Sequence, residues 1–370
     1  MNIAFYWMTM GAYHFARMQA IAALKATSSL KVWESTDLDD HEWVRQDSEN
    51  GYSVASLFHR EMLNNSLVGK AALRLRKRIT EGKTDIFVNG AGYFHPLTLL
   101  PLLKLKRRQG SKIILWSEST SFDNEPSGFR SFVKKQLVKV YDGAIVAGPV
   151  HKEHLLELGM NENSIAVVGN VVDNAFFSTD KPASQRRGFL FVGRLLDIKN
   201  VARLIRAYAS YRRKCEATAI EPEELVIVGD GPEGPNIRRM AKELRMNGIR
   251  LTGSLQVDQV KKEYDQAGAF ILPSISEPWG LVVNEAMASG LPVLVSSKCG
   301  CAPDLVEEGK NGYIFDPLKE EEIAAAMYRI SSEPDKRDAF GKHSLTVIER
   351  FSPAAYAERC GTFFESLLNG

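Results

Sequence analysis

The stretch that decides the fold spans residues 274–297 and reads SISEPWGLVVNEAMASGLPVLVSS. Its middle, Leu281–Ser289, has the length of a short helix, with Pro278 well placed for the first turn and Gly290 as the stop. An apolar run precedes this helix, and Pro292–Val295 follows it, so both flanks are strand candidates. Strand, helix and strand in this order are typical of an α/β domain with a parallel sheet.

Short apolar runs of the same kind recur along the chain. Because they are rich in Val, Ile, Leu and Phe and do not alternate with polar residues, they are typical of strands buried on both faces of a parallel sheet. They alternate twice over with helix-length amphipathic segments, so we predict two doubly wound α/β domains. The strand candidates are Ile3–Tyr6, Lys31–Trp33, Asp85–Val88, Lys112–Trp116, Ala144–Val146, Ile165–Val168, Gly188–Val192, Leu225–Val228, Ile249–Leu251, Ala269–Leu272, Pro292–Val295 and Tyr313–Phe315.

The length of the chain also favours two domains, because 370 residues are too many for one ordinary core. A polar segment at 168–188, with Pro and Ser, precedes a fresh strand and is the boundary candidate. We predict an N-terminal domain over 1–175 and a C-terminal domain over 186–350. A last helix, 353–370, is expected to pack back on the N-terminal domain.

The composition is that of an ordinary soluble globular protein, with 44% hydrophobic and 25% charged residues. The net charge of +2 implies no overall affinity for polyanions, so nucleic acid is not an expected partner. No apolar run approaches the length of a spanning helix, and Met1–Tyr6 is interpreted as a strand and not as a signal peptide. Four scattered cysteines favour a reducing, cytoplasmic compartment.

Basic residues concentrate between Arg60 and Lys139, where 16 Lys and Arg stand against 6 Asp and Glu. The stretches at 72–79, 99–110 and 129–140 mix them with apolar residues. This pattern suits helices that lie on an anionic membrane surface. It equally suits a solvated basic face beside a core-facing stripe, and both interpretations stay open.

Ligands of open parallel sheets bind beyond the carboxyl ends of the strands, so the residues that follow the strand runs are site candidates. Gly11 follows the first strand, either as a simple turn or where backbone N–H groups meet an anion. Arg194 and Lys199 follow the strand at 188–192, and two cations there would suit a diphosphate. The other candidates are a tight turn at Gly229 and a loop that could border a planar base, formed by Gly253, Ser254 and Leu255.

Two glutamates frame the opening stretch. Glu277 is predicted in a loop and Glu285 about two turns into the helix, which corresponds to about 11 Å of rise. A hydrolytic pair of carboxyl groups needs about 5–10 Å, so the spacing does not exclude one. Their loop and helix positions make separate roles in holding one ligand more natural. Trp279 and Gly280, at the helix start, would point N–H groups at a ligand oxygen.

Other motifs are weaker. Cys299 and Cys301 could be half of a metal site, but no partner pair with ligand spacing follows. The acidic stretch STDLDDHE at 35–42 is interpreted as an exposed loop, and His151 and His154 as part of a surface helix. Neither a GxSxG elbow nor a P-loop is present in the sequence. We predict no metal site.

The motifs VGRLLDIKN, VGDGP and SEPWGLVVNEAMASGLPV occur in this order and spacing. They resemble those of the retaining GT-B glycosyltransferases of family 4, the glycosyltransferase group 1 proteins, whose mark is the Glu-x7-Glu element, here Glu277 to Glu285. The resemblance is strong over about 165–345 and only topological before that. It implies two Rossmann-like domains that face each other across a cleft. The N-terminal domain would bind an acceptor and the C-terminal domain a UDP- or GDP-sugar.

The resemblance also implies roles for single residues. Arg194 and Lys199 would grip the diphosphate and stabilise the leaving group without a metal or other cofactor. Glu277 would face the sugar hydroxyls, and Glu285 would bind the ribose hydroxyls. The other donor-binding positions would be Gly11, Gly229, Gly253, Ser254, Leu255, Trp279, Gly280, Leu281 and Val282.

One departure from the family concerns the acceptor side. Many members place a His after the strand that here reads IILWSEST, whereas this chain has Ser117 and Glu118 there. Glu118, or His95 from GYFHP, is expected to substitute for that His in catalysis.

We therefore expect a hexosyltransferase that moves a sugar from a nucleotide-diphosphate donor to an acceptor hydroxyl, with retention of anomeric configuration. The acceptor would be a glycan or glycolipid, in polysaccharide, lipopolysaccharide or glycolipid synthesis. A cytoplasmic location is expected, with peripheral contact at the inner face of the membrane if the basic region binds lipid. The alternatives are a nucleotide-sugar 2-epimerase of the same fold and a non-catalytic nucleotide-sugar-binding protein.

Overall fold

The computed structural model describes residues 1–36, 51–58, 74–75, 77–78, 82–92, 102–103, 105–106, 110–120, 128–243 and 248–369. The chain divides into two compact units. The first unit comprises Met1–Val172 together with Pro353–Gly370, and the second comprises Asp173–Ser352.

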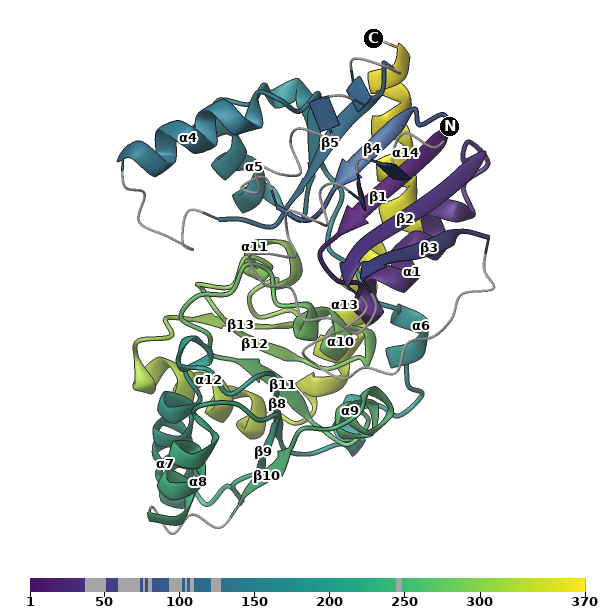
Figure 1. The fold of residues 1–370 in the computed structure, drawn as a ribbon. Coiled ribbons are helices and arrows are strands. Elements are labelled where there is room, and N and C mark those ends of the chain that lie inside the picture. Colours follow the sequence, from purple (N-terminus) through teal and green to yellow (C-terminus); the bar gives the residue numbers. More distant parts are fainter. Residues whose placement is uncertain are drawn as a thin grey trace. The chain divides into compact units, whose positions relative to one another are not determined.

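The first unit is built on a seven-stranded parallel sheet in the order β3-β2-β1-β4-β5-β6-β7 (Figure 1). Its described helices include α1 and α14, which pack against each other although they come from opposite ends of the chain. The strands are β1 Asn2–Trp7, β2 Ser29–Thr36, β3 Ser53–Phe58, β4 Ile86–Asn89, β5 Lys112–Ser117, β6 Gly143–Val146 and β7 Ile165–Val167. The helices are α1 Ala12–Ala22, α4 Gly128–Val138, α5 Pro149–Glu157, the short η1 Glu162–Ser164 and α14 Pro353–Asn369.

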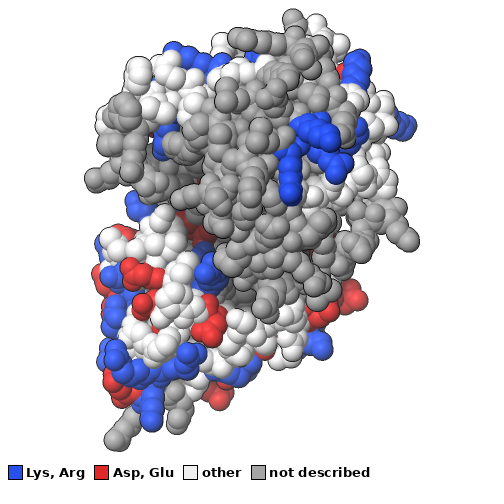
Figure 2. All heavy atoms as spheres, viewed as in Figure 1, with Lys and Arg blue, Asp and Glu red and all other residues white. Residues whose placement is uncertain are grey.

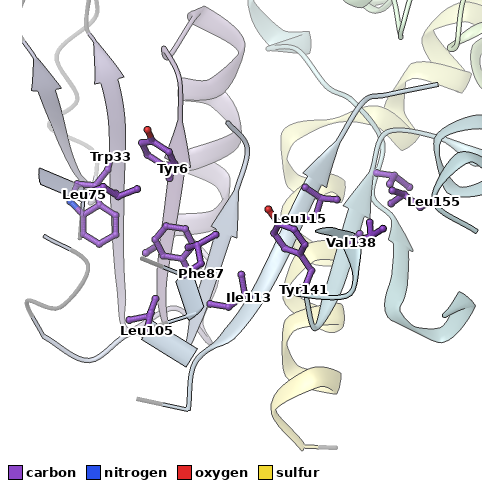
Figure 3. Close-up of a cluster of buried hydrophobic side chains, with 14 of the residues drawn as sticks. Tyr6, Trp33, Leu75, Phe87, Leu105, Ile113, Leu115, Val138, Tyr141 and Leu155 are labelled. Carbon is purple, nitrogen blue, oxygen red and sulfur yellow. The ribbon is translucent and has the colours of Figure 1, made fainter. Parts of the chain in front are cut away.

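Both faces of the first sheet are apolar, and strand periodicity explains how. Successive side chains of a strand point to opposite faces. On β5, Ile113 and Leu115 therefore join the buried cluster shown in Figure 3, with Tyr6, Phe87 and other side chains. Trp116 instead contacts Tyr356 of α14 edge-on, with ring centroids 5.8 Å apart.

The second unit is built on a six-stranded parallel sheet in the order β10-β9-β8-β11-β12-β13 (Figure 1). Helices α7 and α12 pack together, as do α10 and α13. The strands are β8 Phe189–Val192, β9 Leu225–Val228, β10 Ile249–Gly253, β11 Ala269–Leu272, β12 Val293–Ser296 and β13 Gly312–Phe315. The helices are α6 Asn174–Phe177, η2 Ala183–Gln185, η3 Asp197–Lys199, α7 Val201–Ala217, α8 Gly234–Glu243, α9 Val257–Tyr264, α10 Leu281–Ala288, α11 Ala302–Leu305, α12 Glu320–Ser332, α13 Lys336–Ile348 and η4 Glu349–Phe351.

The two sheets share one winding scheme. In each, the first strand lies inside the sheet, the next two lead to one edge, and the fourth returns to the other side of the first. The strand order therefore reverses between β1 and β4 in the first unit and between β8 and β11 in the second. Such a switch point leaves a crevice at the carboxyl ends of its two strands, where α/β proteins bind ligands.

The sequence predictions of α/β class and of two doubly wound sheets are confirmed. Each of the twelve predicted apolar runs is a strand, and β3 was missed because Ser and Ala dilute its apolar character. The predicted role of Pro278 is wrong, because α10 begins at Leu281 with Gly280 as its N-cap. Glu285 is consequently the fifth residue of α10, little more than one turn into the helix and not two.

Candidate functional site

The site candidates of the second unit gather at its switch point, where the loops after β8 and β11 meet. Ile275 N–H donates to Ile198 O at 2.8 Å and joins the two loops. Asn200, in the left-handed region at φ 59°, donates from its amide to Pro273 O at 3.0 Å and Pro317 O at 2.8 Å. One side chain thereby ties together the loops that follow three strands of the sheet.

Lys199 and Glu277 form an ion pair between these loops. The Lys199 ammonium donates to Glu277 Oε2, and the side chains are only 18% and 12% exposed. Ser274 Oγ lies 3.4 Å from the same carboxylate oxygen. The Glu277 backbone is held as well, because its N–H donates to Lys298 O at 3.1 Å and its carbonyl accepts from Gly300 N–H at 2.9 Å. Two residues predicted from separate motifs therefore form one rigid charged pair.

Arg194 lies on the loop after β8, five residues before Lys199, and its side chain is exposed. Within the described part of the chain, its guanidinium makes no ion pair. The loop itself is held by the turn after β9, because Leu195 N–H donates to Asp230 O at 2.9 Å. Arg194 therefore has a fixed loop backbone and an exposed guanidinium, which suits it to bind an anion.

The glycines of the turn after β9 have a packing role. A Cβ on Gly229 would lie 2.0 Å from Gly193 O, and one on Gly231 would lie 2.7 Å from Leu195 O. Only glycine lets the two loops approach this closely. Gly229 therefore supports the loop that carries Arg194, and direct ligand contact by Gly229 stays a prediction.

Helix α10 begins at the same place. Gly280 has φ 100°, and a Cβ there would lie 3.0 Å from Leu272 Cδ2 and 3.3 Å from Glu277 Cγ. Leu281 and Val282 are the first two helical residues, and N–H groups of a first helical turn have no acceptor within their own helix. Such a helix start favours a negatively charged ligand.

The Trp279 side chain belongs to the core. It is 1% exposed, its indole N–H donates to Asn284 Oδ1 at 2.8 Å, and its ring lies 6.0 Å from that of Phe351. Its contribution to a ligand site would therefore come from its backbone, as the sequence predicted.

Glu285 is buried on α10, with 3% of its surface exposed. Its Oε2 accepts a hydrogen bond of 2.7 Å from the Tyr264 hydroxyl. The sequence analysis missed Tyr264, which lies 21 residues earlier on α9 and carries no motif. The loop predicted to border a base follows β10 (Ile249–Gly253): Gly253 has φ 74°, and Ser254 is exposed.

In the first unit, the N–H of Gly11, the N-cap of α1, donates to His14 Nδ1 at 3.0 Å. Burial, with a smaller contribution from the Arg17 charge, lowers the pKa of His14 to about 3, so the ring stays neutral and can accept this bond. Glu118 follows β5, and its Oε1 accepts from Asn170 Nδ2 at 2.7 Å. His95 lies outside the described residues, as does most of the stretch at 35–42.

The thiols of Cys299 and Cys301 are buried beside Glu277. Burial, followed by nearby negative charges that include Glu277, raises the pKa of both thiols well above the usual value. The described residues contain no cluster of three potential metal ligands. His151, predicted on a surface helix, is instead fully buried on α5, because that helix packs on β6 and β7.

Two cavities of the second unit lie away from the Lys199–Glu277 ion pair. One of about 610 Å³ lies at the amino ends of β8, β9 and β10, where Arg186 and Arg250 line it. One of about 280 Å³ lies beside the start of α7, where Asn200 and Ile275 line it. Neither cavity is lined by Glu277 or Glu285.

Residues 173–346 match the family described as "Glycosyl transferases group 1". This part of the chain belongs to the group 1 glycosyltransferase family. The matched range covers the second unit almost completely and includes Arg194, Lys199, Glu277 and Glu285.

Relatives of the group 1 domain include the sulfoquinovosyl transferase SQD2 of Arabidopsis thaliana, 32% identical over 34% of this chain and 25% of that protein. A D-inositol 3-phosphate glycosyltransferase of Corynebacterium kroppenstedtii is 29% identical over 48% of this chain and 40% of its own length. The alpha-monoglucosyldiacylglycerol synthase of Acholeplasma laidlawii is 25% identical over 49% of this chain and 44% of its own length. The chain thus spans less than half the length of these curated relatives.

Solved structures extend the likeness to the whole chain. The lipopolysaccharide outer core galactosyltransferase WaaB, in its apo form, aligns over 99% of both chains with a TM-score of 0.73 and 20% identity. Anabaena Alr3699/HepE, in complex with UDP and glucose, aligns over 99% of this chain and 100% of its own with a TM-score of 0.72 and 16% identity. The chain has the GT-B fold.

Proposed function

We propose that the protein is a glycosyltransferase that moves a hexosyl unit from a nucleotide-diphosphate sugar to an acceptor hydroxyl with retention of configuration. The observation that carries the proposal is the Lys199–Glu277 pair beside the exposed Arg194 at the switch point of a group 1 domain. Preorganised cations of this kind stabilise charge that develops on a leaving group.

Each part of the site would bind one part of the donor. Arg194, Lys199 and the first turn of α10 would hold the diphosphate, which needs no metal where these positive groups supply the charge. Glu277 orients Lys199 and would meet the sugar hydroxyls, while Glu285 would bind the ribose. The acceptor hydroxyl would attack from the face that the diphosphate leaves, and the departing phosphate oxygen would take the proton. The acceptor would be bound by the first unit, with Glu118 or His95 beside its reacting hydroxyl.

The names of the relatives support a glycan or glycolipid acceptor. They include a diacylglycerol glycoside synthase, a sulfoquinovosyl transferase and a lipopolysaccharide galactosyltransferase. The solved complexes with UDP support a nucleotide-linked donor, of which UDP- and GDP-sugars are the candidates. We place the reaction in polysaccharide, lipopolysaccharide or glycolipid synthesis on the cytoplasmic side.

A peripheral contact with anionic membrane is part of this proposal, and α4 supports it. Phe132 is 59% exposed and Lys135 is exposed at the i+3 position, so an aromatic ring and a cation share one face of α4. The exposed Lys139 directly follows the end of the helix at Val138. On the side of the first unit that Figure 2 shows, the described charged residues are mostly Lys and Arg. No described helix is long and apolar enough to cross a bilayer.

The donor test is a thermal-shift panel of UDP- and GDP-sugars, because specific binding stabilises the folded state. A hit is followed by transfer assays on Arg194→Ala and Lys199→Ala. Removing one group that stabilises transition-state charge is expected to lower kcat by about 10²–10³-fold. Arg213→Ala, an exposed Arg of α7 that contacts Ser210, is the matched control. Wild-type turnover in either site variant contradicts the assignment, and epimerised donor in the absence of acceptor indicates the 2-epimerase instead.

The membrane test compares flotation with anionic and neutral vesicles at low salt. Phe132→Ser and the double variant Lys135→Gln/Lys139→Gln are each expected to weaken binding to anionic vesicles, because one removes the apolar anchor and the other the charge attraction. Exposed residues on the second unit, such as Lys310, provide the matched control. Equal recovery of wild type and variants with anionic vesicles contradicts a contact through α4.

A further inference from the structure

In the second unit, hydrogen bonds link Glu285 to two other buried residues, Tyr264 and Arg186. The Tyr264 hydroxyl contacts Glu285 Oε2 at 2.7 Å and Val282 O at 3.2 Å. At the other end of the same residue, Tyr264 O accepts from Arg186 Nη1 at 3.3 Å. Arg186, Tyr264 and Glu285 come from three separate elements, so the chain brings them together only in the folded state.

Tyr264 is completely buried, and its ring is fixed from two sides. Phe177 lies edge-on to it, with centroids 5.8 Å apart, and Phe270 of β11 lies 6.0 Å away. The hydroxyl has one proton for two acceptors. The shorter bond goes to the carboxylate, which is the stronger acceptor. A rigid donor therefore defines where Glu285 Oε2 lies.

Arg186 holds the helices that carry the other two residues. It is 2% exposed, and its guanidinium donates to Ser289 O at 2.9 Å and Gly290 O at 3.1 Å, directly after the end of α10. Its bond to Tyr264 O joins the end of α9 to the same guanidinium. A cation is favourable at a helix C-terminus. Arg186 thus fixes α9 and α10 relative to each other, and with them the Tyr264–Glu285 bond.

The charge of Glu285 matters for what this position can bind. Removing a carboxylate from water is unfavourable even with a hydrogen-bond donor. An amide at this position could accept the same bond from Tyr264 without a buried charge. A carboxylate has two oxygens and no donor, so one held by Tyr264 at Oε2 is suited to accept hydrogen bonds from ligand hydroxyl groups.

We propose that Tyr264 is a positioning residue that presents the Glu285 carboxylate to the ribose hydroxyls of the donor, with Arg186 fixing the two helices that carry them. The inference rests on the proposed function, and it assigns to a residue outside the sequence motifs the selectivity for an intact ribose. Preorganised ligand groups bind more tightly because less ordering remains to be done on binding.

The test measures calorimetric affinities for uridine diphosphate, guanosine diphosphate and their 2′,3′-dideoxy counterparts. The variants are Tyr264→Phe, Glu285→Gln and their combination. Each single variant is expected to weaken binding of the ribonucleotide about tenfold, as expected for loss of a hydrogen bond to a charged group. Affinity for the dideoxy nucleotide is expected to stay within twofold of wild type. The combination is expected to be no weaker than Glu285→Gln alone, because both act through one carboxylate.

Tyr208→Phe is the matched control, since Tyr208 is also a buried tyrosine whose hydroxyl donates, to Glu223 O and Gly248 O. It is expected to leave both affinities unchanged. Equal weakening of ribo and dideoxy nucleotides in Tyr264→Phe would show a merely structural role and overturn the proposal, as would no weakening at all. If Glu285→Gln shows no ribose-specific loss, the inference is wrong while sugar transfer can stand. If wild type binds none of the nucleotides or their sugars, the proposed function itself is wrong.

Discussion

At the residue scale, the Lys199–Glu277 pair joins loops that are 78 positions apart in the sequence. Both side chains are largely buried, so removing one partner leaves the other charge uncompensated. Glu277→Gln and Lys199→Met are each expected to lower the free energy of unfolding by about 2 kcal/mol, the usual range for a hydrogen bond to a charged group. Urea unfolding of the single variants and the double variant measures this loss.

The double variant distinguishes pairing from two independent effects. Because both single changes break the same bond, the loss in the double variant is expected to be clearly smaller than their sum. Lys336→Met and Glu333→Gln provide a control pair, since both side chains of this ion pair are exposed and it is expected to contribute less than about 1 kcal/mol. Strict additivity at Lys199 and Glu277 would contradict the coupling.

A second residue-scale prediction concerns His14 and pH. Its pKa is lowered from 6.5 to about 3 in the folded chain, chiefly by burial. Below pH 6.5 the unfolded chain therefore binds a proton that the folded chain does not, so this contribution to stability is lost as the pH falls from 6.5 towards 3. Unfolding of the first unit, followed at pH 7.0 and pH 5.0, is expected to show a smaller pH-dependent loss in His14→Phe than in wild type.

The His14→Phe variant keeps an aromatic ring against Trp7, whose centroid lies 4.4 Å from that of His14. It removes the acceptor for the Gly11 N–H, so its stability at pH 7.0 is expected to be lower, and only the change with pH is compared. An unchanged pH dependence would show that other groups account for the acid sensitivity.

At the element scale, the start of α10 depends on the backbone of Gly280. Its φ of 100° is unfavourable for any residue with a Cβ, and that atom would press on Leu272 and Glu277. Gly280→Ala is expected to lower the free energy of unfolding by about 1–3 kcal/mol through backbone strain. It is also expected to weaken nucleotide binding, because Glu277 and the first turn of α10 would move. Chemical denaturation and calorimetry measure the two effects.

Gly309 provides the matched control for backbone strain. It has φ 72°, and a Cβ there would meet nothing within 4 Å among the described atoms. Gly309→Ala is expected to lose stability by about 1–2 kcal/mol, as a left-handed residue with a Cβ does, without loss of nucleotide affinity. If both variants bind nucleotide equally well, the start of α10 does not form part of the donor site.

At the scale of the whole molecule, the first unit is discontinuous in sequence and the second is continuous. Helix α14 completes the first unit with Tyr356 and Phe364, both fully buried, and Arg359 Nη1 donates to Val168 O at 3.1 Å. Each buried aromatic side chain contributes about 1.5–3 kcal/mol. Deleting residues 353–370 is therefore expected to remove most of the stability of the first unit, since a domain has only about 5–15 kcal/mol in total.

The second unit is expected to stay folded in this truncated chain and to keep its nucleotide affinity. Hydrogen exchange followed by mass spectrometry separates the two units, with faster exchange expected in β1, β4 and β5 and unchanged exchange in β8, β11 and β12. Native protection of β1 in the truncated chain would contradict the structural role of α14.

The elements were more predictable from the sequence than their contacts. Runs such as Leu225–Val228 and Ala269–Leu272 are apolar throughout and short, so they leave little choice but a strand buried on both faces. β3 was not predicted, because Ser53, Ala55 and Ser56 interrupt its apolar residues. The start of α10 at Leu281 was predicted correctly, whereas Pro278 was wrongly expected in its first turn, because a proline that suits a first turn also suits the loop before one.

By itself, the sequence determined twelve of the thirteen described strands, the α/β class and which residues follow those strand ends, because these depend on side chains close together in the chain. Only the tertiary structure decided that β8 lies beside β11, and therefore that Lys199 meets Glu277 across 78 residues. The same holds for Tyr264 and Glu285, which lie on different helices. Such pairs leave no local pattern, because the contact depends on the order of strands in the sheet and on the packing of the helices that connect them.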